Sequence, residues 1–285
     1  MLGVPQEEGT VPRVVRWRAI WVTSAAALAV LLVTGLGVRI YSERSGWESV
    51  STAIGNYRRL PLADGSTLEW NTASEVRYRL TEQIRELDLA AGEARFRVAH
   101  DTRRPFVVSA GDTVVRAVGT EFTVRIRERR NVDVVVAEGV VAVTRRVRDG
   151  RVRELLFGQQ VPPLEGGTAV EEHHMLTDEG GRLGIAGMIQ RDIEAHDAWR
   201  TNLLIFDEMP LQQVAAEFNR YNRRKIEIDN ETIGRVPISG RYKTSDIDGF
   251  LARLGTMMAI RVVDEEEAGA RVLRVQGVRE QGISR

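Results

Sequence analysis

A Gly-Thr bond in the middle of this sequence is a place where a side chain could act on the chain itself. Gly119-Thr120 stands directly before an alternating apolar stretch, residues 121–127. A threonine hydroxyl can attack the carbonyl carbon of the residue before it when the peptide is strained and a base is near, and water then cuts the ester. Glycine removes Cβ hindrance and permits unusual dihedral angles. The alternative is a turn glycine that leads into a β-favouring threonine, so self-cleavage at Gly119-Thr120 is a hypothesis.

Other catalytic and metal-binding patterns are missing from the sequence. It contains no G-x-S-x-G nucleophile motif and no phosphate-binding or dinucleotide-binding glycine loop. Of the four histidines, His100, His173, His174 and His196, the adjacent pair would point to opposite faces of a strand, so we expect exposed loop histidines. The acidic run at 264–267 is typical of a solvated turn rather than a Ca²⁺ site. The sequence therefore predicts no metal, no cofactor and no enzyme acting on a diffusible substrate.

Composition excludes further classes. The chain has 285 residues, 43% of them hydrophobic and 28% charged, as in folded proteins of about two domains. It has no cysteine, which excludes disulfides, thiolate metal sites and cysteine nucleophiles. Forty basic and forty acidic residues balance, and no basic block stands out. Nucleic-acid binding is therefore not expected, because it needs a basic stripe that displaces counterions.

One long uncharged segment lies near the N-terminus. The run from Ala19 to Val38 contains no charged residue and, at about 1.5 Å per residue, spans about 30 Å, the thickness of a bilayer core. A buried core helix and a cleaved signal peptide are the alternatives, the second because residues 13–18 carry three arginines. We expect an uncleaved single-pass anchor, since signal-peptide apolar regions are typically about 7–15 residues long. The predicted anchor has residues 1–18 in the cytoplasm and the bulk of the chain in the periplasm.

Residues 50–160 have the texture of an all-β domain. Apolar residues alternate with polar ones in short runs that glycine-containing turns separate. No helical stripe interrupts these runs, so we expect a sandwich, a barrel or a β-solenoid. The predicted strands are 57–62, 67–70, 75–80, 85–90, 94–99, 105–109, 113–118, 121–127, 132–137, 139–145 and 152–157.

The remainder divides into a linker and a small α+β module. Residues 161–202 predict a linker that carries a helix, because apolar residues from Ile185 to Trp199 recur with helical spacing. Residues 203–277 predict a β-α-β-β-α-β module that ends with one further strand; proline at 210 suits the start of its first helix. The expected fold class is therefore mainly β with an α+β module, behind a single transmembrane helix.

Several motifs keep a fixed order along the chain. Those in the β region are LADGSTL (62–68) with NTAS (71–74), LAAGEARFRVA (89–99), RPFVV (104–108) and VGTEFTV (118–124). Together they resemble the FecR family of inner-membrane anti-sigma regulators of cell-surface signalling. The C-terminal motifs are LIF (204–206), PLQQV (210–214), FNRY (218–221), ISGRY (238–242) and FLARL (250–254). These are similar to the short module of secretins and TonB-dependent transporters that FecR-type proteins carry.

The resemblance implies a signal receiver. Such proteins dock, in the periplasm, on the signalling domain of an outer-membrane TonB-dependent transporter. Loading of the transporter, often with a ferric siderophore, triggers stepwise cleavage by envelope proteases and release of an extracytoplasmic-function sigma factor. Some members cut themselves at a Gly-Thr bond, which supports the hypothesis for Gly119-Thr120. We expect the transporter contact to be edge-strand addition through Val236, Ile238, Gly240 and Tyr242.

One departure from the family pattern concerns the cytoplasmic side. The resemblance implies a helical sigma-binding domain of several dozen residues, whereas only residues 1–18 precede the predicted anchor. Either the start codon lies upstream, or another protein binds the sigma factor, or this member signals differently. The rival interpretation of the whole chain is a structural or glycan-associated envelope protein with a β-solenoid body and no sigma-factor role.

Overall fold

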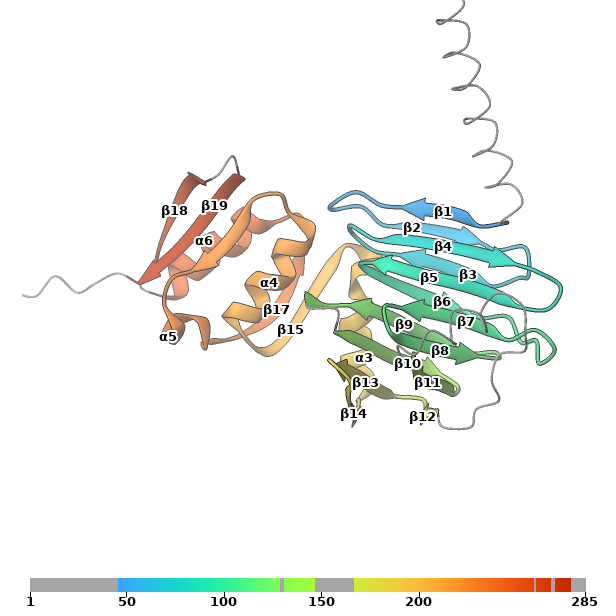
Figure 1. Ribbon diagram of the computed structural model, residues 1–285. Helices are drawn as coiled ribbons and strands as arrows, with labels where there is room; N and C mark the ends of the chain where they lie inside the picture. Colours follow the sequence, from blue (N-terminus) through green and yellow to red (C-terminus); the bar gives the residue numbers. More distant parts are fainter. Residues whose placement is uncertain (1–45, 129–130, 147–166, 259, 268–269, 278–285) are drawn as a thin grey trace, which may run out of the picture. The chain divides into compact units, whose positions relative to one another are not determined.

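Two facing β-sheets make up the first part of the computed structural model, which describes residues 46–128, 131–146, 167–258, 260–267 and 270–277 (Figure 1). One sheet has the strand order β1 (Glu48–Ser51), β4 (Glu75–Leu80), β5 (Arg85–Ala91), β7 (Phe106–Ala110), β8 (Thr113–Ala117), β11 (Val141–Arg145) and β12 (Thr168–Val170). The other has the order β2 (Arg58–Pro61), β3 (Thr67–Trp70), β6 (Glu93–Arg97), β9 (Glu121–Ile126), β10 (Val132–Glu138), β13 (His174–Glu179) and β14 (Arg182–Gly187). Strand order therefore follows the sequence in both sheets.

The core between the sheets follows from the alternating pattern. Leu68, Phe96, Phe122 and Val136 stand opposite one another on β3, β6, β9 and β10, and all four are fully buried. Phe96 lies 5.9 Å from Phe106 of the facing sheet, measured between ring centroids. Because every second residue of a strand points to the same face, these side chains form one layer between the sheets. The expected mainly β fold is confirmed, as two packed sheets and not a closed barrel.

The region expected to be a linker contributes three of these strands. Residues 168–170, 174–179 and 182–187 form β12, β13 and β14, so the predicted helical stripe from Ile185 onward is wrong in its first part. The physical reason is the hairpin at Gly180 and Gly181, whose φ angles of +61° and +102° turn the chain back along β13. The helix α3 begins only at Gln190 and ends at Asp197, before the 3₁₀ turn η2 (Ala198–Thr201).

The C-terminal part alternates strands and helices. Its elements are β15 (Leu203–Pro210), α4 (Leu211–Tyr221), β16 (Lys225–Ile228), α5 (Glu231–Gly234), β17 (Pro237–Lys243), α6 (Ile247–Met257), β18 (Ile260–Glu267) and β19 (Ala270–Gly277). The strands form a β15–β17 pair and a β16–β19–β18 sheet. Phe218 of α4 stacks on Phe250 of α6 with ring centroids 4.5 Å apart. The short helix α5 is additional to the elements that the sequence predicted.

Some predictions lie outside the described residues. No helix in the described ranges is long and apolar enough to cross a membrane. The predicted anchor Ala19–Val38 and the predicted strand 152–157 both lie beyond those ranges. From Glu48 onward the described chain belongs to a single compact unit.

Candidate functional site

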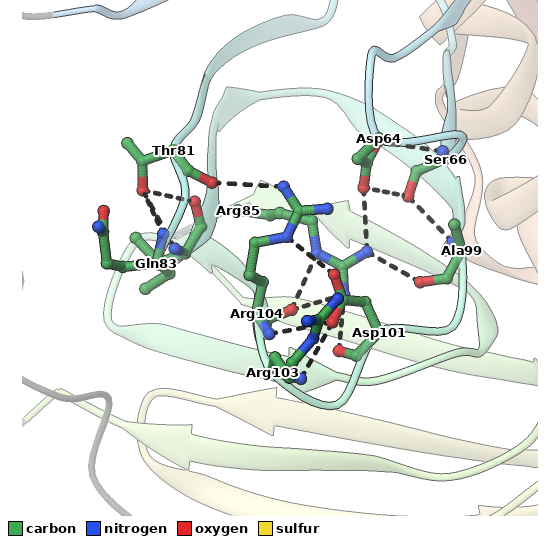
Figure 2. Close-up of polar contacts among 10 residues, drawn as sticks. Asp64, Ser66, Thr81, Gln83, Arg85, Ala99, Asp101, Arg103 and Arg104 are labelled. Atoms are coloured by element: carbon green, nitrogen blue, oxygen red, sulfur yellow. Dashed lines mark hydrogen bonds and ion pairs between the residues drawn. The ribbon is translucent and has the colours of Figure 1, made fainter.

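A fully buried arginine organises the loops around the Gly-Thr bond. Figure 2 shows the guanidinium of Arg85, on β5, between the 64–66 turn and the 99–104 loop. It has no exposed surface and donates to the Asp64 carboxylate at 2.9 Å and to the carbonyl of Ala99 at 2.8 Å. It also donates to the carbonyls of Asp101 at 3.3 Å and of Arg104 at 2.7 and 3.0 Å. We call this arrangement the Arg85 clamp.

The Asp-Gly-Ser motif supplies the other half of the clamp. Gly65 has a φ of +87°, which permits the tight turn. Ser66 donates its hydroxyl to Asp64 at 2.7 Å and accepts the backbone N–H of Ala99 at 3.0 Å. Burial alone would raise the pKa of Asp64, but hydrogen bonds from Ser66 and Arg85 outweigh it and lower that pKa below its ordinary value. The carboxylate therefore stays charged and holds the turn to the loop.

The clamped loop lies against Gly119. Val98 donates its backbone N–H to the carbonyl of Thr120 at 2.9 Å, and Asp101 donates to the carbonyl of Val118 at 3.1 Å. A Cβ on Gly119 would stand 2.6 Å from Nδ1 and 3.1 Å from Cα of His100. Glycine is needed here because of this close approach to His100. The φ angle of Gly119 lies outside the left-handed region, so the close approach to His100, not the backbone angle, requires glycine.

Thr120 carries a hydroxyl without a partner. The residue is 7% exposed, and its Oγ1 is buried with no hydrogen-bond partner among the described residues. On its other side lies the turn glycine Gly139, where a Cβ would come within 2.9 Å of Thr120 Cγ2. Buried polar atoms are nearly always paired, so an unpaired hydroxyl calls for an explanation. The structure thus shows an unpaired Thr120 hydroxyl directly after a glycine that packs against the His100 imidazole.

Comparison with known families identifies the domain that holds this site. Residues 48–142 match the family described as FecR protein. We call this segment the FecR domain. The match begins at β1 and ends within β11, so it includes the Arg85 clamp and Gly119-Thr120. The DGS and RPFVV motifs of the FecR domain, about 40 residues apart, therefore meet at a single buried guanidinium, and the GTEF motif lies against the neighbouring 98–101 segment.

Solved structures show the same fold over most of the chain. Two crystal structures of a candidate anti-sigma factor from Parabacteroides distasonis ATCC 8503 superpose on it with TM-scores of 0.63 and 0.60, each at 21% sequence identity. The superpositions cover 81% and 80% of this chain and 100% and 98% of those chains. No curated protein sequence matches the chain. The likeness therefore extends beyond the FecR domain and concerns the fold.

The residues predicted to contact a partner lie on and just before β17 of the C-terminal module. Ile238 is buried, whereas Val236 and Tyr242 are partly buried against the core of the C-terminal module. Gly240 has a φ of +148°, and a Cβ there would lie 2.9 Å from the Tyr242 ring. These side chains therefore face their own module, and their role in partner binding stays a prediction.

The main-chain groups of β17, unlike its side chains, include some that are available for pairing with a partner. Thr244 donates to the carbonyl of Asn202, and Leu211 donates to the carbonyl of Val236, which fixes the phase of the β15–β17 ladder. In that phase the peptide groups of Arg241 and Lys243 point away from β15. Within the described residues β17 pairs with β15 alone, so the peptide groups of Arg241 and the N–H of Lys243 form a free edge, whereas the Lys243 carbonyl accepts from Asp246. Sequence reasoning missed Arg241 and Lys243 because the ladder phase depends on pairing with β15, about 40 residues earlier.

Among the described residues no group of three or more histidine and acidic side chains converges to hold a metal ion. His173 has a left-handed φ of +58°, and His174 Nδ1 lies 2.9 Å from the carbonyl oxygen of Glu172. His100 lies at the Gly119 site instead. The histidines are therefore distributed over separate elements.

Proposed function

We propose that this chain is a membrane-anchored FecR-type regulator that controls an extracytoplasmic-function sigma factor. The observation that carries the proposal is the FecR match over residues 48–142, whose motifs build the Arg85 clamp. The similarity in fold to an anti-sigma factor candidate over about four fifths of the chain supports it. In this proposal Ala19–Val38 anchors the chain in the bacterial inner membrane, with the N-terminus in the cytoplasm and the FecR domain in the periplasm.

The sigma-regulatory role is tested by transcription. Deleting the gene should change transcript levels from promoters of the sigma factor encoded beside it, at least about tenfold, and the full chain supplied in trans should restore them. An unchanged transcriptome together with altered envelope integrity would contradict the proposal. That outcome would favour the structural or glycan-associated alternative.

We further propose that the signal enters from a TonB-dependent transporter, for instance one that imports ferric siderophores, with envelope proteases acting downstream. Its periplasmic signalling domain would add a strand to the free edge of β17, where main-chain groups are available for pairing. The test is binding of the purified full chain to the signalling domain of the transporter encoded nearby. The variant Arg241→Pro removes an outward N–H, and Arg241→Ala is the matched control that keeps it.

Arg241→Pro should weaken binding at least tenfold, and Arg241→Ala less than threefold. Equal weakening by both would show that the side chain, not the edge, makes the contact. A proline at Ile238 is a poor probe, because in this ladder phase its N–H points into the β15–β17 pair. No binding by the wild-type chain would refute the transporter link itself.

A second candidate function is self-cleavage at Gly119-Thr120, favoured by the unpaired Thr120 hydroxyl and by the His100 side chain packed against the preceding Gly119. In this reaction Thr120 Oγ bonds to the Gly119 carbonyl carbon while His100 takes the hydroxyl proton. The C–N bond then breaks, and the amine of Thr120 takes a proton. Water hydrolyses the resulting ester, which leaves a Gly119 carboxylate and regenerates the Thr120 hydroxyl.

The test of self-cleavage is a denaturing gel of the purified chain. Wild type should give two fragments, Thr120→Ala one full-length band, and His100→Ala a slower appearance of the fragments. Thr123→Ala is the matched control, because Thr123 also carries a buried, unpaired hydroxyl on β9. A single full-length band from wild type after prolonged incubation would exclude the reaction.

A further inference from the structure

The buried hydrophobic side chains form two separate clusters. One lies between the two large sheets and runs from Leu62 to Leu176, and the other lies in the C-terminal module and includes Trp199. Where the two parts of the chain meet, the Tyr57 and Trp199 rings make an edge-to-face contact, with ring centroids 6.0 Å apart. Hydrogen bonds and ion pairs also cross this junction. Each part therefore has its own core, as independently folding domains do.

The centre of the junction is a buried carboxylate on the FecR domain. Glu93, at the start of β6, is 2% exposed and accepts a hydrogen bond from Asn71 at 2.9 Å. Arg220 of α4 donates to the same Glu93 oxygen at 2.5 Å. Asn71 also donates to the hydroxyl oxygen of Tyr221 at 2.7 Å. Two consecutive residues at the end of α4 are thus held by two FecR-domain side chains, which we call the Asn71–Glu93 socket.

Neighbouring residues hold the socket in shape. The backbone N–H of Glu93 donates to Ser74 Oγ at 2.9 Å, and Ser74 Oγ donates to the Glu93 carbonyl at 3.1 Å. Gly92 has a φ of +84°, and a Cβ there would stand 2.2 Å from Ser74 Oγ. Thr72 donates to the carbonyl of Arg220 at 3.1 Å. The NTAS and AGEARF motifs of the FecR domain therefore converge on the FNRY motif of α4.

The charges at the junction alternate in sign. Glu93 pairs with Arg220, Arg220 with Glu217 of the same helix at 2.9 Å, and Glu217 with Arg125 of β9. Burial alone would raise the pKa of both carboxyls, but Arg220 and Arg125 outweigh it and lower both, that of Glu217 to about 2. Each side contributes one positive and one negative group. Neither part would therefore carry a net charge from this cluster when separated.

Such a junction fixes one docked geometry but does not strongly oppose separation of the two parts. Removing one partner of a buried ion pair is strongly unfavourable, because it strands a charge. Returning a whole set of paired charges to water is close to balanced, since hydration replaces the ion pairs. An apolar junction would resist opening in proportion to its area. The observed contacts thus select one docked geometry while leaving separation of the intact parts accessible.

We propose that the Asn71–Glu93 socket is a releasable docking site for the Arg220–Tyr221 end of α4. Opening separates the C-terminal module from the FecR domain while both hydrophobic cores stay folded. This device belongs to the chain alone and does not depend on which partner binds β17. It gives a binding event on the module a route to the FecR domain, because a partner that favours the undocked module shifts the population toward the open form.

The absence of cysteine permits a direct distance measurement on the full chain. Val140→Cys in the FecR domain and Met257→Cys in the module place two spin labels at side chains that are 54% and 75% exposed. The parent chain should give one narrow distance distribution. Glu93→Gln and Arg220→Gln should each broaden it and shift it to longer distances, with the near-ultraviolet circular dichroism kept. Combining Glu93→Gln with Arg220→Gln should broaden the distance distribution little beyond the single variants, because both substitutions break the same contact between Glu93 and Arg220.

Two further variants keep the test decisive. Arg235→Gln is the matched control, since Arg235 makes an exposed ion pair with Glu231 on the same module and should leave the distribution unchanged. Tyr221→Phe removes one hydrogen bond from the socket and keeps the ring, so it should broaden the distribution partially. Distributions identical to the parent in Glu93→Gln and Arg220→Gln would overturn the proposal. Loss of the circular dichroism signal in step with broadening would overturn it too, because the junction would then be part of one cooperative core.

Discussion

Replacing Arg85 by methionine tests how far the FecR domain depends on its clamp. The guanidinium makes five hydrogen bonds, one to Asp64 and four to three main-chain carbonyls of the 99–104 loop. Methionine fills a similar volume but donates none of them. The change leaves the Asp64 carboxylate, whose side chain is 2% exposed, without its positive partner. It also leaves carbonyl groups unpaired.

The expected loss follows from these contacts. Breaking a buried ion pair by removing one partner costs about 3–5 kcal/mol, and each buried group left unpaired costs about 1–3 kcal/mol more unless water reaches it. Because the 99–104 loop lies at the surface of the fold and can relax, we take the lower part of this range. Arg85→Met should therefore lower the free energy of unfolding by at least about 4 kcal/mol. That is a large share of the about 5–15 kcal/mol typical of a domain.

The assay is urea unfolding of the purified chain, followed by tryptophan fluorescence, since Trp70 is only 6% exposed in the FecR core. Arg77→Met is the matched control, because Arg77 pairs with Asp88 at the surface with a side chain 54% exposed. It should cost less than about 1 kcal/mol. Adding Asp64→Asn to Arg85→Met should recover part of the loss by removing the stranded charge. An Arg85→Met variant within about 1 kcal/mol of wild type would refute this reasoning.

Three further predictions concern single residues. Gly92→Ala should lower the unfolding temperature by several degrees, because the left-handed φ of +84° and the 2.2 Å approach to Ser74 Oγ both oppose a Cβ; an unchanged temperature would contradict the geometry. Glu217 has its pKa lowered from 4.5 to about 2, so its charge contributes stability above pH 4.5 that is lost as the pH falls toward 2. Glu217→Gln should therefore remove about 3 kcal/mol at neutral pH and flatten the unfolding free energy over that acidic range; parallel pH profiles of the two proteins would argue against it. Burial raises the pKa of Asp133, so the folded state favours its protonated form and loses stability as the pH rises through that pKa. Asp133→Asn should raise the thermal midpoint at neutral pH, and a clear decrease would show that its ion pair with Arg127 dominates.

Short-range pattern was enough to predict most of the sandwich. Phe96 and Phe122 alternate with charged residues on their strands, and both are fully buried opposite each other. The signal is strong because the side-chain period of a strand is two and one face is buried. The same logic failed at Ile185, where spacing compatible with a helix occurs in the edge strand β14. Every residue of strand β14 is exposed, so burial does not impose an apolar face on its sequence.

Long-range contacts could not be predicted from local pattern. Arginine is ordinarily a surface residue, and nothing near Arg85 in the sequence indicates that Asp64, 21 positions earlier, would make it fully buried. His100, within the clamped 99–104 loop, likewise lies against Gly119, 19 positions later. The contact of Glu93 with Arg220 spans 127 positions. Such pairs depend on tertiary register, which one sequence does not reveal.

The sequential strand order has a consequence for any break between β8 and β9. Strand β9, after the break, pairs with β6 before it over five residue pairs, and β11 pairs with β8 over four. The two pieces would therefore stay joined edge to edge in both sheets, through β6–β9 in one sheet and β8–β11 in the other. A nicked molecule would migrate as one particle in gel filtration while giving two bands after denaturation. Parting the pieces would require mechanical work on both sheets at once, so a pulling force along the chain, rather than the nick itself, would separate them.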